Sequence, residues 1–508
     1  MYFNHLPPLP DFKKAKIVVI GDIMLDRYVH GSVDRISPES PVPILKISHT
    51  ESVLGGAGNV VRNLRALGCQ VNLLAIIGDD ENGKEIKHIL KKESVPTDAL
   101  IVDADHPTIV KSRYVSGMHQ LLRVDAEEIR PPTPEQEKEL HHHLETQLKN
   151  ADVIILSDYG KGLLTDKLIS RIITHANELK KPVLVDPKGR NFTKYKGAYL
   201  ITPNKKELSE ALENHNFKDD SEVEKALIEI TSKCDLQNAL VTRSAEGMSL
   251  YEPHTDPKFH HFKTTAKDVF DVSGAGDTVI AVIAAGLAAG MSLPQSVAIS
   301  NLAGGIVVGK LGTASVYTSE LEHAISSIND RSSSKKSTTR RAMICNWEET
   351  LAQVEDWRRQ GLTIGFTNGS FDILHPGHVT YLNASRDRCD KLLVALNTDD
   401  SIQRYKGLDR PINPLQARMD VIAALGSVDL VVSFGATPGE EDKPLELISL
   451  LKPDLYFKGG DYTLETLPET PLVKDYGGKV EIIPFKDGYS TTRIIQKMKT
   501  SSPKDNVA

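Results

Sequence analysis

The chain has 508 residues, with 61 Lys and Arg against 68 Asp and Glu, which gives a formal net charge of −7. This length predicts two or more separate hydrophobic cores. The balanced charge excludes a disordered acidic protein and a globally basic nucleic-acid-binding protein. Four cysteines without a C-x-x-C pair argue against a zinc ribbon or disulfide scaffold and favour a reducing compartment. The prolines near the N-terminus do not suit a signal peptide, and the apolar stretch 279–293 is shorter than a membrane span. We therefore expect a cytoplasmic protein that binds no membrane and no nucleic acid.

From residue 16 onward, short β-branched segments alternate with helical patterns. The segments predict strands at 17–20, 71–77, 153–157, 183–186, 199–202 and 239–242, and helices at 59–67, 84–91, 134–149, 165–179 and 221–233. Continuous apolar strands separated by helices indicate a parallel sheet covered on both faces. Segments 41–49 and 108–124 alternate like half-exposed strands and predict a small separate sheet.

A change in composition separates a second unit from the first. Residues 326–342 are mostly Ser, Thr, Lys and Arg, which is typical of a linker, and their basic run is more typical of a solvated segment than of a nucleic-acid site. After it we predict strands at 362–366, 391–396, 430–433, 455–458 and 480–484, and helices at 347–359, 378–384, 415–424 and 444–451. The pattern indicates a smaller parallel α/β unit, so the expected domains are 1–325 and 343–508.

The segment DVSGAGDT, residues 271–278, leads into a predicted buried helix. Gly274 and Gly276 allow a tight turn in which several amides point at one anion at the helix N-terminus. Asp277 would then lie beside a bound phosphate, where it could take a proton from an attacking hydroxyl. Because an Asp near a helix start also has a purely structural role with the helix dipole, the interpretation depends on companion motifs.

The companion motifs are GDIMLD at 21–26, GGAGN at 55–59, TPNKKE at 202–207 and VTRSAEG at 241–247. In this order they resemble the ribokinase-like (PfkB) sugar kinases over residues 11–318. The resemblance implies a ribokinase-like α/β fold, Asp277 as the catalytic base, and a β lid made by 41–49 and 108–124. It implies that ATP and its phosphates are bound by Asn204, Lys205, Lys206, Glu207, Thr242, Arg243, Gly247, Gly274, Ala275 and Gly276. It further implies that Asp22, Asp26, Gly56 and Asn59 face the sugar.

The second unit contains TNGSFDILHPGH, residues 367–378, directly after a predicted strand. His375 and His378, three residues apart at a helix start, lie on one face. Gly377 leaves space for a phosphate to approach the backbone. The pair can donate hydrogen bonds to an α-phosphate as negative charge develops on it. A metal pair is a weaker alternative because no third ligand has a suitable spacing, although Asp372 keeps it open, and we assign no metal ligand.

With YKGLDRP at 405–411, LQARMDVI at 415–422, KGGDY at 458–462 and STTRI at 490–494, this motif resembles the cytidylyltransferase-like nucleotidyltransferases. The resemblance implies a smaller Rossmann-like domain that transfers a nucleotidyl group to a phosphorylated acceptor. It implies that His375 and His378 are catalytic and that the nucleotide is bound by Thr367, Asn368, Gly369, Phe371, Asp372, Gly377, Lys406, Arg410, Arg418, Lys458, Gly460, Asp461, Ser490, Thr491 and Thr492. A tetra-anionic triphosphate requires such cations around it.

The fusion of the two motif sets resembles the bifunctional heptose 7-phosphate kinases and heptose 1-phosphate adenylyltransferases of lipopolysaccharide precursor synthesis. The resemblance implies phosphorylation of D-glycero-β-D-manno-heptose 7-phosphate at O1, and adenylyl transfer from ATP to heptose 1-phosphate with release of pyrophosphate. It implies ATP as a substrate of both domains, Mg²⁺, a separate phosphatase between the two steps, and a homodimer formed through the kinase domain. Composition and spacing alone do not distinguish a heptose from another phosphorylated sugar or polyol.

Three other interpretations fit the residues less well. Gly56-Ala-Gly58 before a helix imitates a dinucleotide fingerprint, but Val61 occupies the position of the third glycine. A regulatory protein that retains nucleotides without turnover would be expected to lose at least one of the residues Asp277, His375 and His378. A nucleic-acid-binding protein would need aromatic platforms that the basic run lacks.

Overall fold

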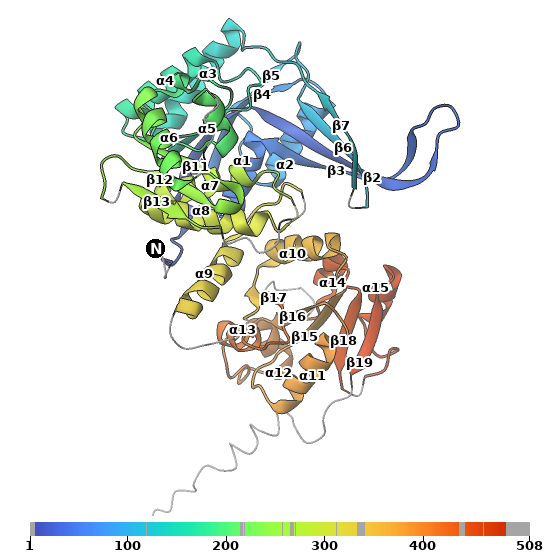
Figure 1. Cartoon of the computed structure of the whole chain (residues 1–508). Helices are drawn as coiled ribbons and strands as arrows, with labels where there is room; N and C mark the ends of the chain where they lie inside the picture. Colours follow the sequence, from blue (N-terminus) through green and yellow to red (C-terminus); the bar gives the residue numbers. More distant parts are fainter. Residues whose placement is uncertain are drawn as a thin grey trace, which may run out of the picture. The chain divides into compact units, whose positions relative to one another are not determined.

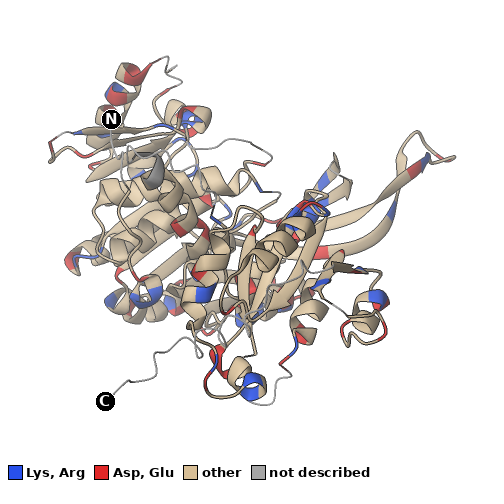
Figure 2. Cartoon of the chain, turned by 90° about the horizontal axis from the view of Figure 1, so that it is seen from below, with Lys and Arg blue, Asp and Glu red and all other residues tan. Residues whose placement is uncertain are grey.

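The structure is a computed structural model (Figure 1), and it describes residues 6–483 except 118, 214–216, 218, 257, 265–268, 270, 311, 333–340, 436–441 and 461. The chain divides into two compact units, Met1–Asn329 and Asp330–Ala508. Within the described ranges, no helix is both long and apolar enough to cross a membrane. Figure 2 shows Lys and Arg interspersed with Asp and Glu along the helices and strands of both units.

The first unit is built on a nine-stranded sheet. In order across it the strands are β13 (Phe259–Phe262), β12 (Met248–Tyr251), β11 (Asn238–Thr242), β10 (Leu200–Ile201), β9 (Val183–Asp186), β8 (Val153–Ser157), β1 (Lys16–Gly21), β4 (Gln70–Gly78) and β5 (Leu100–Asp103). The strands from β5 to β11 are parallel, as predicted, whereas β12 and β13 are antiparallel. The six strands predicted for this sheet are therefore parallel, and β12 and β13, which were not predicted, extend its edge. The five residues between β11 and β12 are too few for a crossover helix, so β12 runs antiparallel to β11.

Helices cover both faces of this sheet because successive residues of its strands point to opposite sides. In β1, Ile17 and Val19 belong to one buried cluster, and Val18 and Ile20 belong to the other. The first cluster includes residues of α1 (Ala57–Ala66), α2 (Glu81–Lys92), α7 (Ala275–Ala288), α8 (Leu293–Val307) and α9 (Thr318–Ser332). The second includes residues of α3 (Pro134–Asn150), α4 (Asp166–Glu178), α5 (Lys205–Ala211) and α6 (Asp220–Lys233). Short 3₁₀ helices are η1 (Phe12–Lys14), η2 (Phe192–Tyr195) and η3 (Ser244–Glu246).

A separate four-stranded sheet forms the predicted lid. Its order is β3 (Pro43–Gly56), β2 (Ile23–Ile36), β6 (Val110–Ser116) and β7 (His119–Ala126), with β2 and β6 parallel. The hairpin of β2 and β3 extends away from the main sheet (Figure 1). The structure confirms strands within 41–49 and 108–124, and it adds β2, which the sequence patterns did not predict.

The second unit contains a six-stranded, wholly parallel sheet. Its order is β14 (Met343–Ile344), β17 (Leu430–Phe434), β16 (Lys391–Asn397), β15 (Ile364–Gly369), β18 (Leu455–Gly459) and β19 (Lys479–Ile483). Its helices are α10 (Trp347–Arg359), α11 (Pro376–Arg386), α12 (Asp399–Lys406), α13 (Leu415–Ala423), α14 (Leu445–Leu451) and α15 (Thr470–Asp475). Because chain order reverses around β15, the carboxyl ends of β15, β16 and β18 form the place where such sheets bind ligands.

The last helix of the first unit runs into the segment predicted as a linker, 326–342. Helix α9 continues to Ser332, so its last turns occupy the first part of the predicted linker. Leu321 and Ile325 are buried in the first core and fix the start of this helix. A helix that is already nucleated extends through polar residues at little cost, so polar composition did not mark its end. Residues 333–340 lie outside the described residues.

Candidate active sites

The first site is centred on Asp277, in the first turn of α7. Gly274 caps this helix with φ 76°, in the left-handed region that glycine adopts without strain. A Cβ added to Gly274 would lie 2.5 Å from the side-chain amide of Asn59, whereas one added to Gly276 would meet no protein atom within 4 Å. Open space therefore lies beside the amides that begin α7, as a phosphoryl-binding turn requires.

The carboxylate of Asp277 is 3% exposed and accepts two hydrogen bonds. The Asn59 side-chain amide donates to Oδ2 at 2.8 Å, and the Tyr159 hydroxyl donates to Oδ1 at 2.8 Å. Burial raises the pKa of Asp277 to about 6, although both hydrogen bonds oppose the rise. A carboxyl group with this pKa is ionised at neutral pH but close enough to neutrality to accept a proton, which suits a general base.

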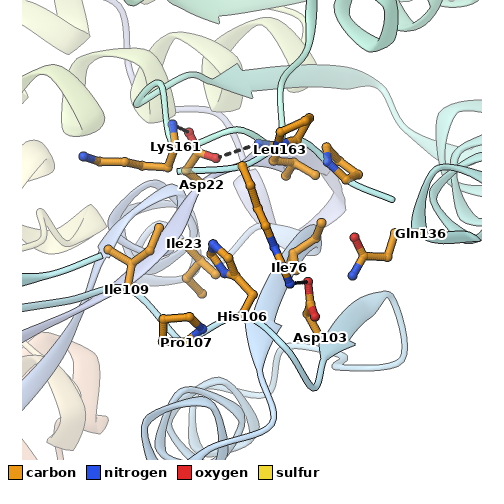
Figure 3. Close-up of a pocket in the computed structure, with 13 residues that line it drawn as sticks. Asp22, Ile23, Ile76, Asp103, His106, Pro107, Ile109, Gln136, Lys161 and Leu163 are labelled. Atoms are coloured by element: carbon orange, nitrogen blue, oxygen red, sulfur yellow. Dashed lines mark hydrogen bonds and ion pairs between the residues drawn. The ribbon is translucent and has the colours of Figure 1, made fainter. Parts of the chain in front are cut away.

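Asp22 follows β1, and its carboxylate is directed at the loop after β8. It accepts hydrogen bonds from the backbone N–H groups of Tyr159 at 3.1 Å, Lys161 at 2.9 Å and Leu163 at 3.3 Å. Figure 3 shows Asp22 beside Lys161 and Leu163 in a pocket that also contains Asp103. Asp22 was predicted to face the sugar, and this geometry gives its carboxylate a structural role in holding the loop.

The other three residues predicted for the sugar side gather at the base of the lid. Asp26 on β2 forms an ion pair with Arg113 on β6 and acts electrostatically on Asp277. Gly56 has φ 58°, and a Cβ there would lie 2.4 Å from the backbone oxygen of Asp22. Only glycine fits this approach between β3 and the end of β1. Asn59 contacts Asp277, as described above.

Apart from Gly274, Ala275 and Gly276 at the start of α7, the residues predicted for ATP follow the carboxyl ends of β10 and β11. Asn204 and Glu207 form a reciprocal capping box at the start of α5, and Glu207 also forms an ion pair with Lys188. Thr242 pairs with Asn204 in an isolated parallel bridge. Arg243 is buried and bonded to Asp220, Glu246 and Ser249, so its guanidinium fixes the β11–β12 turn.

Three further residues of this set have contacts of their own. Lys205 and Lys206 form ion pairs with Glu246 and Glu210. Gly247 has φ 91°, and a Cβ there would lie 1.9 Å from the Phe262 backbone oxygen, which no other residue type would allow.

The second site begins where β15 leads into α11. His375 is the N-cap of this helix, and its ring stacks on His378 with centroids 3.8 Å apart. Phe371, with φ 40°, places its ring edge-to-face against the His378 ring, with centroids 5.2 Å apart. Burial, together with the charges of His375 and Lys406, lowers the pKa of His378 to about 4. The His378 ring is therefore neutral at physiological pH, and Gly377 lies buried between the two histidines.

Cationic residues surround this pair, but they differ in how far they are already bonded. Lys406 donates to the Ser370 hydroxyl at 2.8 Å. Arg410 pairs with Asp372, which also accepts from the backbone of Ile412 at 2.9 Å. Asp372 thus joins the loop before α11 to the loop after α12.

Arg418 is 1% exposed and bonded entirely to protein. Its guanidinium donates to the backbone oxygens of Asn413, Ser370 and Asn397 and to the carboxylate of Asp399. Arg418 was predicted to bind the nucleotide. In the structure its guanidinium connects three segments of the chain, at Asn413, Ser370 and Asn397.

The remaining predicted nucleotide ligands lie along β15 and β18. The Thr367 hydroxyl bonds to the Tyr381 hydroxyl at 2.6 Å, and the Asn368 side-chain oxygen accepts from Lys458 at 3.0 Å. Gly369 ends β15, and Gly460 follows β18 with φ 115°. Asp461, Ser490, Thr491 and Thr492 lie outside the described residues.

Tyr159, Arg113, Ser370 and Asp399 are site residues that sequence reasoning missed. Each acts through a contact with a predicted residue more than ten positions away in the sequence. The available signal was weak: Tyr159 stands in the LSDYGKG stretch and Ser370 within TNGSFD, but no spacing rule assigned either a role.

Each of the two units matches a known protein family. The model of the pfkB family carbohydrate kinases matches residues 14–320, and the Cytidylyltransferase-like model matches residues 366–497. The bifunctional protein HldE of Caulobacter vibrioides is 44% identical over 494 residues, which cover 97% of this chain and 98% of that protein. The bifunctional protein HldE of Paramagnetospirillum magneticum is 43% identical over 482 residues, or 95% of this chain and 96% of that protein.

A solved structure of similar fold is phosphofructokinase-2 from Escherichia coli in complex with potassium. It has a TM-score of 0.52 at 19% identity and covers 62% of this chain and 99% of its own. Ribokinase from Arabidopsis thaliana, complexed with ribose and ATP, has a TM-score of 0.50 at 17% identity and covers 61% of this chain and 99% of its own. These matches confirm the two resemblances and the ribokinase-like fold of the first unit.

Proposed function

The chain belongs to the HldE family of bifunctional proteins, and on this basis we propose that it catalyses two steps of ADP-heptose synthesis for the lipopolysaccharide core. The first unit phosphorylates D-glycero-β-D-manno-heptose 7-phosphate at O1 with ATP. The second unit transfers the adenylyl group of ATP to heptose 1-phosphate and releases pyrophosphate. The observation that carries the proposal is the match to HldE proteins over nearly the whole chain, with both motif sets present.

In the kinase step, Asp277 takes the proton of the attacking sugar hydroxyl. As the new O–P bond forms, the bond between the γ-phosphorus and the β,γ-bridging oxygen breaks, and ADP leaves. The amides of Gly274, Ala275 and Gly276 are placed at the positive end of α7, where they stabilise the charge on the transferring phosphoryl group. Asp26, Gly56 and Asn59 line the sugar side of this centre.

In the adenylyl-transfer step, no residue of the protein forms a covalent bond. His375 and His378 donate hydrogen bonds to the α-phosphate, and Lys406 neutralises part of the triphosphate charge. Arg410, Lys458 and the backbone near Gly377 and Gly460 complete the nucleotide site. The acceptor phosphate oxygen attacks the α-phosphorus, and the bond to the departing pyrophosphate breaks.

Magnesium fits the carboxylate-rich side of the kinase site. Burial and the neighbouring carboxylates of Asp277 and Glu207 raise the pKa of Asp186 well above its usual range. Such an excess of negative charge fits a divalent cation that accompanies the phosphates of ATP, held at the end of the site formed by Asn204 and Glu207. The ion would neutralise charge on the phosphates.

We also propose the organisation around these two reactions. The kinase domain comprises residues 1–325, residues 326–342 contain the connection, and the adenylyltransferase domain comprises residues 343–508. A separate phosphatase removes the 7-phosphate between the two steps, because the residues that we assign carry out only phosphoryl and adenylyl transfer. A homodimer forms through the kinase domain, and the reactions take place in the cytoplasm.

The test offers purified full-length protein each sugar separately with Mg-ATP. Heptose 7-phosphate should give the 1,7-bisphosphate and ADP, and heptose 1-phosphate should give ADP-heptose and pyrophosphate. Mannose 6-phosphate and mannose 1-phosphate are the matched controls. If the mannose phosphates turned over and the heptose phosphates did not, the alternative of a fused kinase and nucleotidyltransferase for another sugar would replace this proposal.

A further inference from the structure

We propose that Tyr159 is a positioning residue of the kinase site, whose hydroxyl holds the Asp277 carboxylate oriented toward the sugar hydroxyl. The inference rests on the proposed kinase function and assigns Tyr159 a role that motif analysis did not give it. The contact that carries it is the 2.8 Å hydrogen bond from the Tyr159 hydroxyl to Oδ1 of Asp277. The other carboxylate oxygen is held by Asn59, so both oxygens are fixed from opposite elements, the β8–α4 loop and α1.

The position of Tyr159 is itself determined by the end of β1. A Cβ at Gly21 would lie 2.2 Å from the Ser157 backbone oxygen, so β1 and β8 approach closely where both strands end. There the Asp22 carboxylate binds the backbone N–H groups of Tyr159, Lys161 and Leu163. Asp22 thereby fixes the loop from both ends of its first turn, as Figure 3 shows for Lys161 and Leu163. A loop with three backbone bonds to one buried carboxylate holds its side chain in a defined place.

The surroundings of Asp277 make this hydrogen bond important. The carboxylates that interact electrostatically with Asp277 include Asp26 on β2, which is paired with Arg113 on β6, and Asp186 at the end of β9. Burial and the neighbouring carboxylates raise the pKa of Tyr159 well above its usual range, so the phenol stays protonated and donates. Within the part of the chain that the structure describes, the Asn59 amide and the Tyr159 phenol are the side chains that donate hydrogen bonds to the Asp277 carboxylate.

The proton balance of the step leaves the phenol unchanged. The sugar O–H proton moves to a carboxylate oxygen of Asp277 as the sugar oxygen bonds to the γ-phosphorus, and Tyr159 keeps its own proton throughout. Loss of the phenol should therefore slow proton transfer and destabilise the ionised form of Asp277, while contacts with the sugar stay the same. We therefore expect kcat to fall while the KM for the sugar is unchanged.

The experiment compares full-length wild type with Tyr159→Phe, measuring bisphosphate formation from heptose 7-phosphate and Mg-ATP between pH 5 and 9. Tyr251→Phe, in β12 of the same unit, is the matched control. Pyrophosphate release from heptose 1-phosphate by the same samples reports the second site. We expect Tyr159→Phe to lower kcat about tenfold or more and to leave the KM for the sugar within about twofold. The acid limb of the pH profile of kcat/KM should shift to higher pH by about one unit, because the carboxylate loses a hydrogen bond.

An unchanged kcat and acid limb, or a raised KM with kcat preserved, would overturn the inference. Replacing Tyr159 by a fluorotyrosine keeps the ring and the fold, and its more acidic phenol is a stronger donor. The acid limb should then move to lower pH, and an unmoved or upward limb would contradict the proposal even if Tyr159→Phe did not fold. Wild-type turnover in the same assay tests the proposed function separately, because its absence would refute the kinase assignment and not the role of Tyr159.

Discussion

Replacing Asp277 by asparagine is expected to abolish phosphoryl transfer and, at the same time, to stabilise the kinase unit. Asparagine can still accept a hydrogen bond from Asn59 and can donate one to the Tyr159 oxygen, but it carries no charge. Burial raises the pKa of the wild-type carboxyl from 3.8 to about 6. The folded state therefore binds more protons than the unfolded state between these values, and stability is lost as the pH rises through about 6.

The size of the effect follows from the shift in pKa. Two units at about 1.36 kcal/mol each give a penalty of about 3 kcal/mol at pH 8 that Asp277→Asn should remove. At pH 5 the carboxyl is already mostly protonated in the folded state, so the gain should fall to roughly half. The asymmetry between the two pH values identifies the carboxylate as the cause.

Hydrogen exchange of the full-length protein, followed by mass spectrometry on peptides from β8 and β9, gives the opening free energy of the kinase unit. The control is built into the chain, because both tryptophans, Trp347 and Trp357, lie in the second unit. Tryptophan fluorescence during urea unfolding should be the same for wild type and Asp277→Asn. If the variant were no more stable than wild type at pH 8, or if its gain were equal at pH 5 and pH 8, the reasoning would be refuted.

Three further outcomes are expected. Gly276→Ala should fold normally, because the added methyl meets no protein atom within 4 Å. It should lower the kinase kcat/KM for ATP at least about tenfold, because the methyl occupies space that the phosphate needs. Gly426→Ala, where the added methyl also meets no protein atom within 4 Å, is the control and should leave this kcat/KM unchanged. Arg418→Lys should destabilise the second unit by about 3 kcal/mol, as measured by tryptophan fluorescence during urea unfolding, because Lys cannot make all the hydrogen bonds of the guanidinium. A raised KM for ATP with unchanged stability would instead indicate that Arg418 binds ATP directly. The pKa of His378 is about 4, so this residue should not titrate near pH 6.5. An inflection near pH 6.5 in the rate of pyrophosphate release that is present in wild type and absent in His378→Gln would contradict this expectation.

Sequence patterns predicted elements well where burial is continuous. The residues of β8 and β9 were predicted to the residue, since an uninterrupted apolar run in a two-sided sheet has sharp ends. Helix α10 was also predicted to the residue, and the capping box of Asn346 and Glu349 marks its start. In contrast, β2 was missed because its outer half is polar, and it is held by pairing with β3 and β6 rather than by its own pattern.

In the candidate sites, too, residues in local motifs were predicted, whereas residues that act through distant contacts were missed. Asp277, His375 and His378 stand in compact motifs, and these motifs together with their companion motifs predicted a role for each of them. Tyr159 reaches Asp277 across 118 positions, and that contact depends on the loop that Asp22 holds. Arg418 illustrates a second limit, because sequence does not distinguish an arginine whose donors bind a triphosphate from one whose donors bind backbone oxygens.

The most direct test of two independent active sites uses Asp277→Ala and His375→Ala in the full-length protein, with both heptose phosphates offered to each variant. Asp277→Ala should lose only bisphosphate formation, and His375→Ala should lose only pyrophosphate release, because each residue belongs to a different compact unit. If either substitution abolished both activities while hydrogen exchange showed both units folded, the account of two separate catalytic centres would be contradicted.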